Sequence, residues 1–123
     1  MSEFIKLVAT SEVPQGAMKE VESEGHPLLV ARVGGTFLVA DARCPHLGGH
    51  LAEGVLVGAV VTCPRHHSQF DLTDGRVVRW TDFTGPLEQV NETIRHHRPL
   101  QMYEVRVADG VVSVGPPKAA AGA

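Results

Sequence analysis

The sequence has 123 residues, 43% of them hydrophobic and 20% charged, with a formal net charge of -3 at pH 7. This length fits one domain, and the hydrophobic fraction suffices for a buried core, which excludes a disordered chain. The 11 basic residues are scattered, so the charge pattern favours a protein or small-molecule partner over nucleic acid or an anionic membrane. The first residues lack the features of a secretory signal and no apolar run is long enough to span a bilayer, so we expect a cytoplasmic protein.

Short strands separated by turn signals are predicted along the chain, which is typical of an all-β sandwich or barrel. The first two expected strands cover Phe4–Val8 and Ala17–Glu22. The next two, Leu28–Val33 and Thr36–Ala40, are rich in β-forming residues. They are joined by Gly34-Gly35, a pair able to take the positive φ angles of a tight turn. The sequence therefore predicts an antiparallel hairpin here.

One segment in the second half of the chain departs from the β pattern. After a strand expected over Val55–Thr62, the residues Leu87, Val90 and Ile94 recur at helical spacing. This spacing predicts a short helical insert over 85–98, ended by the proline that follows it. We expect the insert to pack as a surface helix.

A second hairpin is predicted around Asp109-Gly110, because valines alternate with polar residues on both sides of this turn signal. The last residues, "GPPKAAAGA", have little apolar surface to bury. We therefore expect one domain over residues 1–115 and a mobile tail over 116–123.

Two cysteines and two histidines form the most specific pattern in the sequence. Cys44 and His46 lie in "CPHLGG", and Cys63 and His66 lie in "CPRHHS". Without an export signal, the two cysteines are expected to stay reduced for metal binding or catalysis. Two thiolates and two imidazoles suit either zinc or an iron–sulfur cluster. The C-x-H spacing is unlike that of common structural zinc sites, and a Cys44–Cys63 disulfide is the remaining alternative.

The wider stretch "CPHLGGHLAEG...TCPRHHSQFDLTDGRV" resembles the cluster-binding region of Rieske-type 2Fe-2S proteins, in particular the small soluble ferredoxins. The resemblance extends beyond the four candidate ligands to Leu51, Gly54, Pro64, Phe70, Asp71 and Gly75. It implies a β-sandwich of three small antiparallel sheets, with two loops that hold one 2Fe-2S cluster.

The resemblance also implies the roles of individual residues. Cys44 and Cys63 would bind one iron, and His46 and His66 the other. His67 stands where the family usually has glycine, and we interpret it as an exposed loop side chain rather than a second ligand.

Residues around the expected cluster are assigned by the same resemblance. The backbone amides near Gly48 would point at the cluster, and the hydroxyl of Ser68 would donate to a cluster sulfur. Phe70 replaces a tyrosine that gives high-potential members a second such bond. Gly49 and Arg65 occupy the places of two cysteines that form a disulfide in cytochrome-complex Rieske domains. These differences favour a soluble ferredoxin.

The function implied is that of a one-electron carrier, which passes electrons from a flavin reductase to a terminal enzyme such as a ring-hydroxylating dioxygenase. The chain itself is not expected to be an enzyme, because oxygenation needs a mononuclear iron site in a further domain. Two alternatives remain: a small Rieske-like subunit of an assimilatory nitrite reductase, and a zinc-stabilised interaction module.

Overall fold

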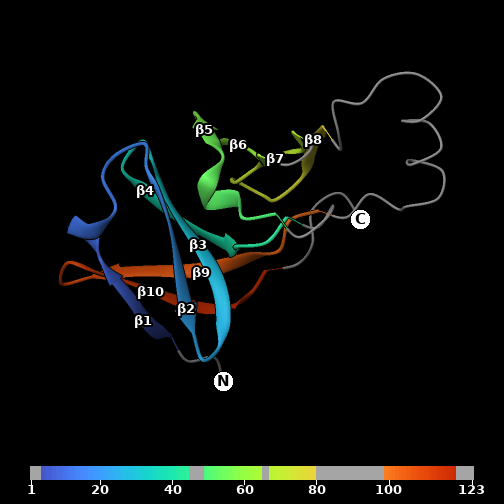
Figure 1. Ribbon diagram of the computed structural model, residues 1–123. Coiled ribbons are helices and arrows are strands. Elements are labelled where there is room, and N and C mark those ends of the chain that lie inside the picture. Colours follow the sequence, from blue (N-terminus) through green and yellow to red (C-terminus); the bar gives the residue numbers. More distant parts are fainter. Residues whose placement is uncertain (1–3, 45–48, 65–66, 80–98, 119–123) are drawn as a thin grey trace, which may run out of the picture.

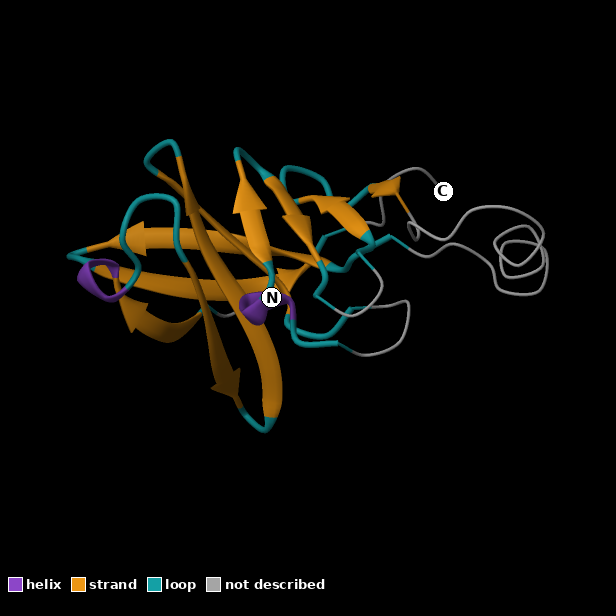
Figure 2. Cartoon of the chain, turned by 45° about the horizontal axis from the view of Figure 1, so that its top comes forward, coloured by secondary structure: helices purple, strands orange, loops and turns teal. Residues whose placement is uncertain are grey.

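The computed structural model describes residues 4–44, 49–64, 67–79 and 99–118. These residues form an all-β domain, as predicted, with two short 3-10 helices, η1 (Thr10–Glu12) and η2 (Leu51–Glu53) (Figure 2). The strands are β1 (Ile5–Ala9), β2 (Met18–Ser23), β3 (His26–Val33), β4 (Thr36–Asp41), β5 (Val55–Val57), β6 (Val60–Thr62), β7 (Gln69–Asp71), β8 (Val77–Arg79), β9 (Met102–Ala108) and β10 (Val111–Pro117). No helix in the described part of the chain has the length and apolar character needed to cross a membrane. The helix predicted over 85–98 lies outside the described residues.

The larger sheet has six antiparallel strands in the order β1-β10-β9-β4-β3-β2. Its two three-stranded halves join where β4 meets β9, through only two residue pairs, Val39 with Tyr103 and Ala40 with Met102. The smaller sheet has the order β5-β6-β7-β8 and lies above the long strands in Figure 1. The described residues thus form two sheets, and the expected three strand groups appear if the halves of the larger sheet are counted separately.

Two hairpins of the larger sheet form as the sequence predicts. Gly34 and Gly35, with φ of 57° and 84°, connect β3 to β4, so the expected positive angles are confirmed. Asp109 and Gly110, with φ of 52° and 73°, connect β9 to β10 in the same way. Strand β10 continues to Pro117, beyond the domain boundary expected at residue 115, and residues 119–123 of the predicted tail lie outside the described residues.

The smaller sheet corrects one prediction. The single strand expected over Val55–Thr62 is a hairpin of two three-residue strands, β5 and β6. It turns at Gly58, whose φ of 59° breaks the extended run. Strands β7 and β8 are not predicted from the sequence, because three-residue strands are too short to show an alternating pattern.

Strand β3 is covered on both of its faces, which explains its continuous apolar run. Leu28 and Val30 belong to a core within the larger sheet, together with residues of β1, β4 and β10. Leu29 and Ala31 belong to a second core between the two sheets. The rest of this second core consists of Ala40, Ala42, Cys44, Leu51, Val61, Cys63, Phe70, Leu72, Leu100 and Met102.

Candidate metal centre

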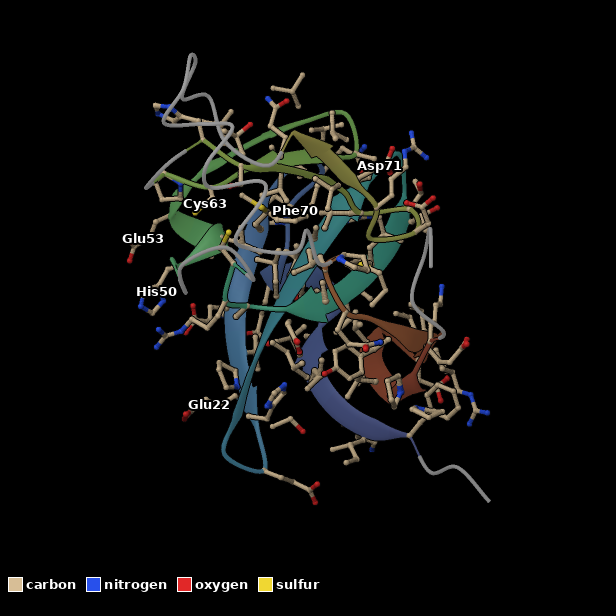
Figure 3. All side chains as sticks on the ribbon, turned by 90° about the vertical axis from the view of Figure 1, so that its right-hand side faces the viewer. Glu22, His50, Glu53, Cys63, Phe70 and Asp71 are labelled. Carbon is tan, nitrogen blue, oxygen red and sulfur yellow. The ribbon has the colours of Figure 1, made fainter. Side chains whose placement is uncertain are left out.

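The two cysteines lie in the same buried core, although eighteen residues separate them in the sequence. Cys44 follows strand β4 and is 3% exposed, and Cys63 follows strand β6 and is 2% exposed. Both are free thiols, so the disulfide alternative does not describe this structure. Figure 3 shows Cys63 beside Phe70 in the interior, below the small sheet. Two elements from different sheets therefore deliver one soft ligand each to a site shielded from water.

The backbone closes both cysteine loops with the same hydrogen bond. The N–H of Cys44 donates to the carbonyl oxygen of Gly49 at 2.8 Å, and the N–H of Cys63 donates to that of Ser68 at 2.8 Å. Each cysteine is thus bonded to the residue five positions later. The histidines predicted as ligands, His46 and His66, occur inside these two loops but lie outside the described residues.

The first loop is held at its base by further backbone contacts. Arg43 and His50 form an antiparallel bridge, and the N–H of Leu51 donates to the carbonyl oxygen of Ala42 at 3.0 Å. Gly49 is buried at the closing end of the loop. Gly48, predicted to turn its amide toward the cluster, lies outside the described residues.

In the second loop, His67 has φ of 60°, in the left-handed region that favours glycine. The backbone geometry at this position therefore accounts for the glycine usual in the family. The side chain of His67 is exposed, as expected for a loop residue, and its N–H donates to the carbonyl oxygen of Cys63 at 3.1 Å.

Ser68 and Phe70, which follow the second cysteine, are also buried. Ser68 has no exposed surface and is the buried polar residue of the described part of the chain. Phe70 is fully buried as well and packs in the core that contains both thiols. Both side chains therefore lie in the interior of the protein.

Two glycines from the motif allow close packing around this loop. A Cβ atom on Gly54 would overlap the carbonyl oxygen of Thr62, the residue before Cys63. A Cβ atom on Gly75 would overlap the carbonyl oxygen of Leu100, and Gly75 also has φ of 84°. Only glycine lets these backbone segments approach so closely.

The turn between β7 and β8 is built around Asp71. Its Oδ1 accepts hydrogen bonds from the N–H and the hydroxyl of Thr73 at 2.9 and 2.5 Å, and its Oδ2 lies 3.0 Å from Nη2 of Arg76. Burial acts to raise the pKa of Asp71, but the bonds from Thr73 and the charge of Arg76 outweigh it, and the net pKa is lowered. The carboxylate therefore stays ionised and fixes the turn that follows Phe70.

His50 pairs with a carboxylate of a neighbouring strand. Its Nδ1 lies 2.9 Å from Oε1 of Glu20 on strand β2, and both side chains are partly buried. In Figure 3, His50 and Glu53 lie on one flank of the molecule, on the outer side of the buried thiol. No sequence signal links residues 20 and 50, because the contact depends on how η2 lies against β2.

The donor set fits a metal that accepts soft ligands. Across the described ranges, no three side chains from histidine, cysteine, aspartate and glutamate gather into a metal site. The two buried free thiols are the ligand candidates that the described residues bring together. Two thiolates in an apolar core, at the start of two matched loops, are chemically suited to hold an iron–sulfur cluster.

Comparisons with known proteins agree with this arrangement. The family model described as "Rieske [2Fe-2S] domain" matches residues 3–103. The chain is 32% identical over 112 residues to "Ferredoxin CarAc" of Metapseudomonas resinovorans, covering 90% of this chain and 92% of the relative. It is 33% identical over 75 residues to the ferredoxin component of a naphthalene 1,2-dioxygenase system of Pseudomonas aeruginosa, covering 61% of this chain and 72% of the relative.

Solved structures give two further comparisons. One chain of a complex of reduced oxygenase and oxidised ferredoxin in carbazole 1,9a-dioxygenase matches with a TM-score of 0.71 and 31% identity, over 90% of this chain and 91% of that chain. The terminal oxygenase of carbazole 1,9a-dioxygenase from Nocardioides aromaticivorans IC177 matches with a TM-score of 0.73 and 25% identity. That match covers 91% of this chain but only 29% of the oxygenase chain.

Proposed function

The chain belongs to the Rieske [2Fe-2S] domain family, and we propose that it serves as the ferredoxin of a multicomponent oxygenase system. The observation that carries this proposal is the length over which the chain matches its relatives. It aligns with 92% of a ferredoxin but with only 29% of a terminal oxygenase chain of the same fold. The chain therefore corresponds to the carrier rather than to the catalytic component.

The proposed ligands are Cys44 and Cys63 for one iron and His46 and His66 for the other. The burial of both free thiols and the identical closure of the two loops support this set. When bound, a 2Fe-2S cluster with two imidazole ligands takes up and releases one electron, at potentials of about -150 to +300 mV. The chain's own contribution is to keep the thiols dry and to fix both loops.

Ser68 is proposed to tune this potential through its hydroxyl, and the amide of Gly48 to contribute from the first loop. The position of Ser68 supports its part, because its side chain is buried and its carbonyl oxygen closes the loop that begins at Cys63. Phe70, packed in the same core, offers no such donor.

The proposed partners are a flavin reductase as donor and a terminal oxygenase as acceptor, in the cytoplasm. The relatives support this pairing, because one is the ferredoxin component of a dioxygenase system and another structure contains oxygenase and ferredoxin together. Nucleic acid and membrane partners are not proposed, since the 11 basic residues are scattered along the sequence.

An optical spectrum of the purified protein, with iron, sulfide and zinc analysis, tests the proposal. We expect a red-brown protein with an iron–sulfur absorption band, equal amounts of iron and sulfide, and reversible bleaching by a flavin reductase. A colourless protein with bound zinc and no sulfide would contradict the proposal and support a zinc-stabilised interaction module.

A further inference from the structure

Three polar side chains meet on one face of the larger sheet, outside the cysteine core. The hydroxyl of Tyr103 donates to Oδ1 of Asp41 at 2.6 Å, and Nε2 of His26 lies 2.9 Å from the same oxygen. The third side of the triangle, from the Tyr103 hydroxyl to Nε2 of His26, measures 3.3 Å. We call this group of His26, Asp41 and Tyr103 the polar clamp.

The polar clamp joins three strands where the two halves of the larger sheet meet. Its members come from the first residue of β3, the last residue of β4 and the second residue of β9. At this point β4 and β9 share only two residue pairs, and Tyr103 belongs to one of them. The bond from Tyr103 to Asp41 crosses this junction, beside a backbone bond from the N–H of Asp41 to the carbonyl oxygen of Gln101 at 2.9 Å. The bond from His26 holds the same carboxylate from β3.

The chain runs from Asp41 directly to the first cysteine loop. Strand β4 ends at Asp41, and Cys44 follows three residues later, after the bridge between Arg43 and His50. Ala40 and Met102, the other residue pair of the junction, pack in the same core as both thiols. Opening of the junction would thus loosen the packing beneath Cys44 and admit water to the thiols.

The clamp is suited to this task over a wide pH range. Burial, together with the hydrogen bond to Asp41 and its charge, raises the pKa of Tyr103 well above the usual value of 10.0. Tyr103 therefore remains a donor in neutral and moderately alkaline solution. His26 adds a second donor to the same carboxylate oxygen as long as Nε2 carries a proton.

We propose that Tyr103, Asp41 and His26 act as positioning residues for the Cys44 loop, and that their hydrogen bonds govern cluster retention and reduction potential. This inference rests on the proposed electron-carrier function. It concerns side chains that are not members of the cysteine core.

The test compares Tyr103→Phe, which removes one hydroxyl, with Glu12→Gln as the matched control. Glu12 is likewise a surface carboxylate with two donors, Lys19 and the N–H of Ala9, but it belongs to η1 and has no contact with the cysteine core. Cluster release to an iron chelator and the potential by voltammetry are measured on the purified holoprotein. For Tyr103→Phe we expect about fivefold faster cluster release and a shifted reduction potential. This factor is the change in a local opening equilibrium when one typical hydrogen bond is lost. The control should match the wild type in both measurements.

Asp41→Ala and Asp41→Asn separate the clamp from general destabilisation. The asparagine oxygen can still accept from Tyr103 and His26, so Asp41→Asn should retain most of the wild-type release rate, whereas Asp41→Ala should release as fast as Tyr103→Phe. If Tyr103→Phe only lowers the melting temperature and leaves release and potential unchanged, the positioning role is wrong.

A further measurement distinguishes this inference from the proposed function. If the purified protein holds no iron and sulfide, the electron-carrier proposal fails, but the clamp can still be tested by thiol reactivity. In a Cys63→Ser background, Tyr103→Phe should then increase the reaction rate of the Cys44 thiol with a thiol reagent about fivefold. An unchanged rate would contradict the clamp itself.

Discussion

His67 is a non-glycine residue in a left-handed backbone conformation, which glycine adopts more easily. His67 has φ of 60° and an exposed side chain, directly after the histidine proposed as a ligand. The exposed side chain agrees with the interpretation of His67 as a loop residue. Whether the cluster is bound by His66 and not by His67 is the subject of the next prediction.

The first prediction separates the two adjacent histidines. His66→Ala should abolish the native cluster, because it removes one of four proposed ligands, whereas His67→Ala should leave iron and sulfide content near the wild-type level. Metal and sulfide analysis of both purified variants provides the measurement. Equal loss of cluster in the two variants would contradict the ligand assignment.

The second prediction concerns hydroxyl donors at the buried positions 68 and 70, which follow Cys63. Ser68→Ala should lower the reduction potential, because it removes a hydroxyl that stabilises the added negative charge. Phe70→Tyr should raise the potential, since it supplies a second hydroxyl near the same core. Voltammetry on holoproteins of equal iron content checks both. The opposite order of potentials would rule out the proposed hydrogen bonds to the cluster.

At the scale of elements, the smaller sheet depends on its turns more than on its strands. Its four strands have three residues each, so the backbone pairing that they offer is small. The turn after β7 compensates with a side chain, because Asp71 accepts from Thr73 and pairs with Arg76. This turn directly follows Phe70 and so helps to hold Phe70 in the cysteine core.

The third prediction is the pH dependence of this turn. Because the folded pKa of Asp71 is lowered, its contribution to stability is present above the unfolded pKa, about 3.9, and is lost as pH falls through the folded value. Asp71→Asn should reduce the free energy of unfolding by about 1 kcal/mol at pH 7. The difference from wild type should shrink below about pH 4.

Urea unfolding at several pH values measures this dependence. Asp74→Asn is the matched control, since Asp74 belongs to the same turn and also accepts from Arg76, but its side chain is 42% exposed against 14% for Asp71. The control should change stability by less than about 0.5 kcal/mol. A difference for Asp71→Asn that does not vary with pH would show that its charge is not the cause.

At the scale of the whole molecule, the two sheets meet through Gly75. The N–H of Leu100, just before β9, donates to the carbonyl oxygen of Gly75 at 2.8 Å. A Cβ atom at this position would overlap Leu100 and press on the side chain of Met102. The contact thus joins the turn of the smaller sheet to the start of β9, the strand that carries Tyr103 of the polar clamp.

The fourth prediction tests this contact against a matched glycine. Gly75→Ala should reduce the free energy of unfolding by about 3 kcal/mol, from left-handed strain of about 1–2 kcal/mol plus displacement of Leu100. Gly58→Ala carries the same kind of strain at φ of 59° but meets no atom within 4 Å, so it should cost only about 1 kcal/mol. Urea unfolding of both variants gives the comparison, and equal losses would mean that the approach of the two sheets is not restrictive.

The sequence determined those features that depend on local residues. Glycine and aspartate at two turns predicted two of the long hairpins of the larger sheet, because these residues adopt positive φ angles more easily than others. The residues around Cys44 and Cys63 predicted the family, which the match to the family model confirms.

Only the tertiary structure decided which distant residues meet. The pairing of β4 with β9, the contact of His50 with Glu20 and the polar clamp join positions up to 77 residues apart. Such contacts depend on how strands of one sheet curve toward each other and on which face each side chain occupies. The physical reason is that a local pattern determines the conformation of a segment but not which segment packs against it. That pairing depends on burial of the whole hydrophobic core.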